Sequence, residues 1–551
     1  MGTTIRKPRG AWRPGPTGGR KVRGRGGIGR LLRFGFGATA LALFSNPATG
    51  AVRANEAPEA ALTIRLVRPQ EQGERLLDLF RGARAPNPAA ALAAWKHATG
   101  GRGSLGKPLE AAVAALNPVM VREFRGLDGA EFALGFAPTT GSPRWRATVP
   151  NDDDSFAALA SALALTDGAV EEPFGSAPVL RVGPAGAPLA AVRDGRLALG
   201  STREELRAAF DRLHAPPAPE PGPSGVRARL DPDGLRGLTS TAGRRLSAWF
   251  DALGYSEADG RLALDGAALT CEVTARLNPA APGASPPTLD PSWLDPVPSA
   301  GVVAAVAAAL DTSAGSLDAA FAALDRVDRA DPARAGVAPL RTRLNLLAAA
   351  ARVRPEVDLW PNLKGATAAL LVDDAGRPSG AVVALHATTP DAAGRVARDV
   401  LPRLSSSFLS GRKADDPGRP AADGVTFLGT VDGRPLSCTT RGRTVLVGWG
   451  DGSLAAALEA SERPERSAGA ALREGWGATP PQRAGGLWVG RLRAVAAPGS
   501  PLALALAASP PVVWQGHNAG ATARDVARWP GLDATVRRWL DALPLEPPPD
   551  R

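Results

Sequence analysis

The chain has 551 residues, 44% of them hydrophobic, and a formal net charge of +11 at pH 7. That length allows two to four domains of ~100–200 residues, and the hydrophobic fraction is ordinary for a folded chain with a core. The net positive charge lies at one end of the chain. Residues 1–54 carry eleven Lys and Arg and no acid, so the formal charges of residues 55–551 sum to zero. The body therefore lacks the basic surface that nucleic-acid binding requires, and we expect no nucleic-acid partner.

Residues 1–54 have the order of a secretory signal peptide. A basic stretch ends at Arg33, an apolar run follows over 34–44, and small residues come after Pro47. The apolar run is too short to span a bilayer, which takes ~20 residues. We expect export, cleavage after Ala54, and a soluble periplasmic or secreted chain with no membrane span. A basic tail with a chance apolar patch is the alternative interpretation.

The first half of the chain, residues 55–278, alternates β-rich segments with helical ones. Asn87 can cap a helix that begins at Pro88, and Asp194-Gly195 is a strong hairpin signal. The expected strands are 61–67, 130–136, 145–149, 179–182, 189–192, 196–199, 226–230 and 261–277, the last with a turn at Asp265-Gly266. The expected helices are 70–80, 88–97, one from 108, 155–165, 202–213 and 235–253.

A proline-rich linker over 279–299 separates this half from a second one, residues 300–543. The expected strands there are 301–310, 366–372, 381–386, a hairpin within 433–449, and 487–492. The expected helices are 316–327, 340–353, 390–404, one after the hairpin up to 458, 521–528 and 534–543. Residues 544–551 are expected to be a disordered tail.

The two halves resemble each other in sequence. Residues 127–134 share five of eight identities with 363–370, and residues 186–200 share six of fifteen with 433–447. A spacing of more than 200 residues indicates paired domains and not a solenoid of short repeats. The sequence therefore predicts an α+β protein of two related tandem domains, each a mainly antiparallel sheet with helices packed on it.

Several segments approach a catalytic or ligand-binding motif without completing one. Residues 101–108 resemble a phosphate-binding loop, but Pro108 stands where the loop needs Ser or Thr. The three carboxylates at Asp152, Asp153 and Asp154 lack the ligand spacing of a calcium loop, so helix capping is the preferred interpretation. Arg441-Gly442-Arg443 could contact an anion, and an exposed turn is the simpler interpretation.

The four histidines are more than a hundred residues apart, so no local metal-binding pair exists; they are His97, His214, His386 and His517. Only Cys271 and Cys438 are present, both in expected strands; they could pair in an oxidising compartment or remain buried thiols. The twelve tryptophans are assigned to the core, with an aromatic sugar-binding platform as the alternative.

We assign no catalytic, cofactor-binding or metal-binding residue from the sequence. The leading expectation is a non-catalytic binding or scaffold protein of the periplasm or cell envelope. Its partner would be an envelope protein, a glycan or a small ligand. The alternative is an extracytoplasmic, hydrolase-like enzyme with its site in the cleft between the two domains, where clefts are common.

Overall fold

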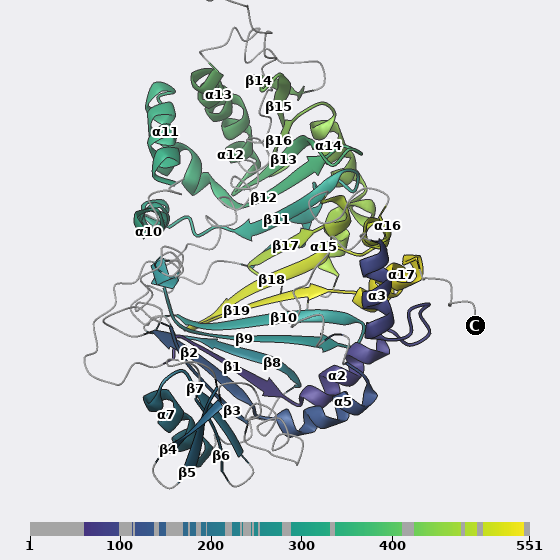
Figure 1. Ribbon diagram of the computed structural model, residues 1–551. Helices are drawn as coiled ribbons and strands as arrows, with labels where there is room; N and C mark the ends of the chain where they lie inside the picture. Colours follow the sequence, from purple (N-terminus) through teal and green to yellow (C-terminus); the bar gives the residue numbers. More distant parts are fainter. Residues whose placement is uncertain are drawn as a thin grey trace, which may run out of the picture.

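A computed structural model provides the structure of the chain (Figure 1). It describes residues 60–98, 113, 116–136, 143–149, 169–174, 177–182, 189–193, 196–214, 223–231, 234, 244, 247–248, 250–251, 254–277, 288–313, 315–330, 337–409, 424–474, 476, 480–492 and 500–544.

The strands of the first half are β1 (Leu62–Val67), β2 (Glu131–Phe136), β3 (Pro143–Val149), β4 (Ala169–Phe174), β5 (Ala177–Val182), β6 (Leu189–Arg193), β7 (Arg196–Gly200), β8 (Gly225–Leu230), β9 (Tyr255–Asp265) and β10 (Ala268–Leu277). Those of the second half are β11 (Val302–Ala309), β12 (Leu363–Val372), β13 (Pro378–Ala387), β14 (Thr426–Val431), β15 (Arg434–Arg441), β16 (Thr444–Trp449), β17 (Arg483–Leu487), β18 (Val512–Ala519) and β19 (Thr522–Trp529).

The α-helices are α2 (Pro69–Asp78), α3 (Pro88–Ala98), α5 (Pro118–Glu123), α7 (Arg203–His214), α10 (Ser316–Ala330), α11 (Val337–Ala350), α12 (Pro390–Arg395), α13 (Leu401–Leu409), α14 (Ser453–Glu462), α15 (Ala468–Arg473), α16 (Pro501–Ala507) and α17 (Leu532–Ala542). Shorter helical turns include η2 (Pro291–Leu294), η6 (Val396–Val400), which joins α12 to α13, and η9 (Val489–Arg491).

The nineteen strands in the described part of the chain belong to one sheet, and neighbouring strands pair antiparallel. The spatial order is β4-β5-β6-β7-β3-β2-β1-β8-β9-β10-β19-β18-β17-β11-β12-β13-β16-β15-β14. The expected α+β class with antiparallel pairing is therefore confirmed. The separate sheets expected for the two halves are instead continuous, because β10 and β19 pair along their length.

The order of strands in the first half recurs in the second. Reading inward to the β10–β19 seam, β5-β6-β7-β3-β2-β1-β8-β9-β10 corresponds to β14-β15-β16-β13-β12-β11-β17-β18-β19. Equivalent hairpins close in the same way: Gly266 follows β9 with φ 61° and Gly520 follows β18 with φ 57°. Both positions need the left-handed conformation that glycine adopts most readily. The seam thus joins two equivalent strands.

Helices cover the two sheet faces unevenly (Figure 1). In the second half, α12 and η6 pack on Cys438 and Val445 from one face. Leu454 of α14 packs on Ala384 and Leu446 from the other face. In the first half α7 lies on β7 through Leu206 and its neighbours. A further cluster joins the halves, because Ala91 and Ala94 of α3 pack on Leu540 of α17.

Two sequence predictions near the C-terminus are wrong. Residues 521–528 form strand β19 and not a helix, because their alternation places them between β18 and β10 in the sheet. The strand expected at 487–492 ends at Leu487 and occupies 483–487 instead. Its two glycines give a weak strand signal, but they are needed: a Cβ on Gly485 would overlap the Trp514 indole, and one on Gly486 would meet Leu472.

The other expectations on described residues agree closely with the structure. Asn87 caps α3 by accepting a hydrogen bond from the Ala90 N–H at 2.9 Å. Strands β4, β14 and β18 were not predicted. Several expected features lie outside the described residues. They are the proposed leader, the loop-like segment at 101–108, the carboxylates at 152–154, the helix expected at 155–165, the turn Asp194-Gly195, and most of the helices expected from 108 and over 235–253.

Candidate functional site: an open apolar sheet face

The middle of the sheet has two unlike faces. Residues alternate between faces along each strand, and residues paired across strands share a face. At the seam, one face carries Glu272, Arg524 and Arg528, and we call it the charged face. Cys271 and Ala527 pair on the opposite face. We call that side the apolar face, and the residues that define it follow from the register of the strands.

One row of the apolar face crosses eleven strands, from β1 to β16, without a charged or hydrogen-bonding side chain other than the indole of Trp514. Its members are Leu66, Val226, Leu262, Cys271, Ala527, Trp514, Gly485, Val306, Ala368, Val383 and Val447. A flanking row includes Leu264, Leu269, Trp529, Val512, Leu487, Ala304 and Leu370.

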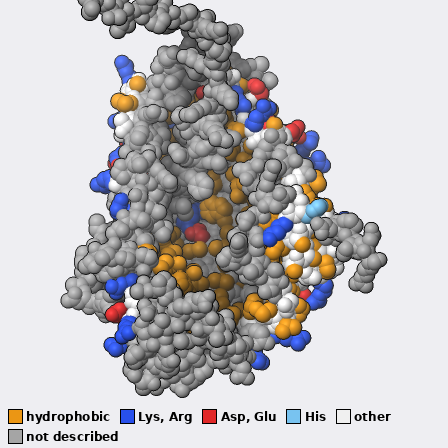
Figure 2. Space-filling model, viewed as in Figure 1, with side chains coloured by type: hydrophobic (Ala, Val, Ile, Leu, Met, Phe, Trp, Pro, Cys, Tyr) orange, Lys and Arg blue, Asp and Glu red, His pale blue; other side chains and the backbone are white. Residues whose placement is uncertain are grey.

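Large side chains of this face are exposed to solvent on several of its strands. Leu262 is 46% exposed, Val226 39% and Phe132 37%, and Val383 and Leu487 are 36% exposed. Figure 2 shows hydrophobic side chains gathered in a hollow over this part of the sheet. Strand and residue spacings give three rows across eleven strands an area on the order of 1,000 Å². Soluble monomers rarely expose an apolar patch larger than a few hundred Å².

A third row flanks the first on its other side and includes Ala228, Gly260, Val273, Ala308 and Ala366; one ion pair interrupts it. Arg483 of β17 donates through Nη2 to Asp525 Oδ1 of β19 at 3.0 Å, and through Nη1 to Asn518 Oδ1 at 3.2 Å. Gly516 lies between them on β18, where a Cβ would sit 2.6 Å from Arg483 Nε. The Arg483 side chain is 3% exposed and that of Asp525 32%. The pair is thus set into the apolar floor.

Tyr255 of β9 lies beside the seam, opposite Leu277 of β10. Burial raises the pKa of Tyr255 to about 12, and the negative charge of Asp525 adds to the effect. Its phenol therefore stays protonated across the physiological range.

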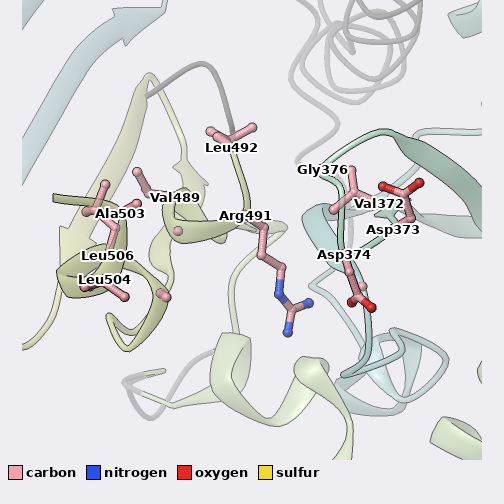
Figure 3. A pocket seen from close by; sticks show the side chains of 13 residues that line it. Val372, Asp373, Asp374, Gly376, Val489, Arg491, Leu492, Ala503, Leu504 and Leu506 are labelled. Carbon is pink, nitrogen blue, oxygen red and sulfur yellow. The ribbon is translucent and has the colours of Figure 1, made fainter. Parts of the chain in front are cut away.

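A pocket of about 390 Å³ lies where the apolar rows reach the strand ends (Figure 3). Val372 follows Leu370 by two residues on β12, and Val489 follows Leu487 by two at the end of β17. Leu504 of α16, which is 62% exposed, forms another apolar wall. Two of the lining residues thus lie close in sequence to members of the apolar face, and charged groups line the same pocket.

Arg491 is the cation of this pocket. Its Nη1 donates to the carbonyls of Ser299 at 3.1 Å and Val302 at 2.7 Å, and its Nη2 donates to Ser299 at 3.1 Å. Burial lowers the pKa of Arg491 from its ordinary value, although the guanidinium remains charged. Among the described residues no carboxylate lies within ion-pair distance of it.

Two carboxylates line the opposite wall. Asp373 is engaged by Arg377, whose Nε lies 2.9 Å from Oδ2 and whose backbone N–H lies 2.8 Å from Oδ1. These hydrogen bonds, the backbone one foremost, lower the pKa of Asp373. Asp374 is exposed, and Figure 3 shows its carboxylate facing the same pocket as the Arg491 guanidinium.

A second hollow, of about 470 Å³, lies on the charged face beside α7. Its charged groups largely neutralise one another: Arg212 pairs with Glu131 at 3.0 Å, Arg146 with Glu205 at 3.2 Å, and Arg229 with Glu257 at 2.6 Å. This arrangement accounts for those side chains without a ligand.

The histidines considered in the sequence do not converge. His97 is exposed on α3, and His517 lies on β18. His386 is buried, stacked on Trp293 with ring centroids 4.8 Å apart. The side chain of His214 lies outside the described residues. In the described part of the chain no three His, Cys, Asp or Glu side chains gather as a metal site would require.

The remaining sequence candidates have structural roles. Arg441 lies 3.8 Å from Glu462 and donates to the Leu458 carbonyl at 3.3 Å, so that hairpin turn is joined to α14. Cys271 and Cys438 are both free thiols; Cys438 is buried, which raises its pKa to about 11. Trp293 is buried, and the other tryptophans assigned to the core are half-buried wherever the structure describes them.

Sequence reasoning missed the apolar face and its pocket. The alternation in β9, β10 and β12 was visible, but the register that places those residues on one face requires the pairing of strands far apart in the chain. None of the helices in the described ranges has both the length and the hydropathy to cross a bilayer.

Comparison with known proteins gives no family. No protein-family model matches the chain, and no curated protein matches it. Crystal forms I, IV and III of TP0453 are similar to it, with TM-scores of 0.22, 0.23 and 0.22 and identities of 10%, 10% and 11%. The alignments cover 41%, 40% and 41% of this chain and 81%, 78% and 82% of TP0453. At these TM-scores the likeness carries no argument about fold or function.

Proposed function

We propose that this protein is a non-catalytic binding protein that holds the acyl chains of a lipid on its apolar face. The observation that carries the proposal is the exposure of large apolar side chains along a continuous apolar face of the sheet. Such a surface destabilises a chain in water unless something covers it, so it marks a binding site.

The chemistry of the face favours acyl chains. Backbone groups of the central strands are satisfied in the sheet, and the row from Leu66 to Val447 offers almost no hydrogen-bonding side chain. A bound extended peptide would leave its own amides unpaired there, which costs several kcal/mol per group. An acyl chain has no such groups. Burial of ~10 methylenes contributes about 8 kcal/mol, which corresponds to micromolar affinity.

We also propose that the protein acts outside the cytoplasm and that its halves descend from a duplication. Export rests on the basic stretch and apolar run of residues 1–54. Duplication is supported by the matching strand order and by the two sequence matches. The match of 127–134 with 363–370 has an offset of 236, the same as the offset of β2 from β12 in the sheet. No observation favours the hydrolase alternative, and we do not propose it.

Cys271 provides a direct test of acyl binding. Its thiol lies in the apolar row beside Leu262 and Ala527, whereas the Cys438 thiol is buried and serves as an internal control. We expect a long-chain fatty acid or phospholipid to slow maleimide labelling of Cys271 at least tenfold. Saturating lipid that leaves the Cys271 rate unchanged would contradict the proposal.

Substitution of the face provides a second test. The double variant Leu262→Asp, Val226→Asp places charge on paired positions of the row and should weaken binding of a fluorescent fatty acid at least tenfold. The matched control is Leu346→Asp on α11, a leucine that is 66% exposed outside the face. Equal affinity in the double variant and this control would argue against the site.

A further inference from the structure

We propose that the pocket of Figure 3 binds a zwitterionic lipid head group, with its phosphate on Arg491 and its ammonium on Asp374. The proposal rests on the proposed function, since the same lipid's chains would lie on the apolar face. It assigns the polar end of the ligand and therefore the class of lipid.

Arg491 is suited to a phosphate. It is a half-buried cation held by the carbonyls of Ser299 and Val302, with no carboxylate in ion-pair distance among the described residues. Those carbonyls fix the guanidinium at the pocket wall. They do not neutralise its charge. A planar guanidinium with free N–H groups is the usual protein partner of a phosphate.

Asp374 is suited to an ammonium. Its neighbour Asp373 is committed to Arg377 by two hydrogen bonds, whereas Asp374 is exposed on the wall opposite Arg491 and has no hydrogen-bond partner among the described residues. A head group with phosphate alone would leave Asp374 without a cation. An uncharged head group would leave Arg491 without an anion. A phosphate followed by an ammonium satisfies both walls.

The apolar lining connects this head-group site to the chain site. Val372 ends β12 two residues after Leu370, and Val489 begins η9 two residues after Leu487; Leu370 and Leu487 belong to the apolar face. Leu504 adds an exposed aliphatic side chain at the same pocket. In the proposed complex, the chains of a lipid with its head at Arg491 would pass these apolar side chains to reach the face.

The experiment compares three lipids with identical acyl chains, delivered from vesicles and measured by fluorescence: phosphatidylethanolamine, phosphatidylglycerol and diacylglycerol. We expect the full chain to bind phosphatidylethanolamine at least tenfold more tightly than the other two. Arg491→Gln should remove that advantage over diacylglycerol. Asp374→Asn should bring phosphatidylethanolamine and phosphatidylglycerol to within about twofold of each other.

Arg528→Gln on the charged face is the matched control and should change none of the three affinities. Because Arg491 also holds the start of β11, Arg491→Lys and a thermal unfolding curve accompany Arg491→Gln. The exposed Asp374→Asn variant keeps the test valid if Arg491→Gln unfolds.

The outcomes separate the two proposals. Equal binding of all three lipids, or a preference that survives both substitutions, overturns the head-group assignment and leaves acyl binding standing. Failure to bind diacylglycerol as well as the phospholipids overturns both. Binding of free glycerophosphoethanolamine as tight as that of the lipid would show that the chains contribute nothing, and it overturns the assignment to a lipid.

Discussion

His386 gives the molecule a specific dependence on pH. Its ring is 2% exposed, stacked on Trp293, and its Nε2 lies 3.0 Å from Thr367 Oγ1. Thr367 donates its own hydroxyl proton to the Trp293 carbonyl, so Nε2 carries the proton and donates. Burial is the main cause that lowers the pKa of His386 to about 3. The folded state therefore requires the neutral ring.

Because the folded pKa lies below the unfolded value of ~6.5, the unfolded chain binds the proton more readily between those values. The contribution of the neutral His386 ring to the free energy of unfolding is fully present above pH 6.5 and decreases as the pH falls below it. At pH 5.0 the loss from His386 should be about 2 kcal/mol. Urea unfolding at pH 7.5 and 5.0 measures this loss. In the His386→Phe variant, the free energy of unfolding should lack the part of its pH dependence that comes from His386. Identical slopes in the two proteins would refute the role of His386.

Gly516 permits the ion pair in the apolar floor. A Cβ there would overlap Asp525 Oδ1 and lie 2.6 Å from Arg483 Nε. Gly516→Ala should separate the pair while leaving Arg483 buried, at a cost of about 2–4 kcal/mol in the free energy of unfolding. Gly260→Ala is the control, because its Cβ would have ordinary contacts at 3.6 Å and beyond. Equal stability of the two variants, measured with denaturant, would contradict the prediction.

At the scale of elements, helices α7 and α14 occupy equivalent places. Gly200 ends β7, and Gly448 lies near the end of β16. A Cβ on Gly200 would lie 2.5 Å from the backbone nitrogen of Leu206. A Cβ on Gly448 would lie 2.6 Å from the backbone nitrogen of Leu454, which is also six residues later. Both leucines are buried under their helices. Leu206→Ala and Leu454→Ala should each cost about 2–4 kcal/mol. A large loss for one and none for the other, in urea unfolding, would show that the two contacts are not equivalent.

Sequence reasoning succeeded for elements whose signals are local. Asn87 before Pro88 indicates the start of α3, and the alternation of residues 363–372 indicates β12. Each signal lies within a few residues of sequence. It failed at β17 and β19. In β17, Gly485 and Gly486 serve packing by Trp514 and Leu472, and in β19 pairing with β10 decides the conformation. Tertiary contacts override local preference at both places.

The site illustrates the same limit at the scale of the whole molecule. The sequence predicted a binding protein but named no site residue, because the apolar face exists only after Leu262, Trp514 and Val383 are brought into one row. Those residues are more than a hundred positions apart. Arg491 likewise meets Asp374 across a pocket built from β12, β17 and α16. No periodicity in one segment contains that information.

The continuous sheet also predicts how the molecule unfolds. The first and second halves share the β10–β19 ladder from Leu269↔Trp529 to Arg276↔Thr522, and the α3–α17 cluster. Neither half can open without exposing the edge of the other. We therefore expect the chain to unfold in one cooperative transition. Amide hydrogen exchange in β8 and in β12 should then report the same free energy of opening.

Leu540→Ala tests that coupling, because Leu540 is fully buried where α17 meets α3. It should lower stability by about 2–4 kcal/mol and accelerate exchange equally in β8 and β12. Leu454→Ala, whose packing lies within the second half, should also accelerate both if the sheet unfolds as a unit. Faster exchange in β12 alone, measured by mass spectrometry, would show that the halves open independently despite the shared ladder.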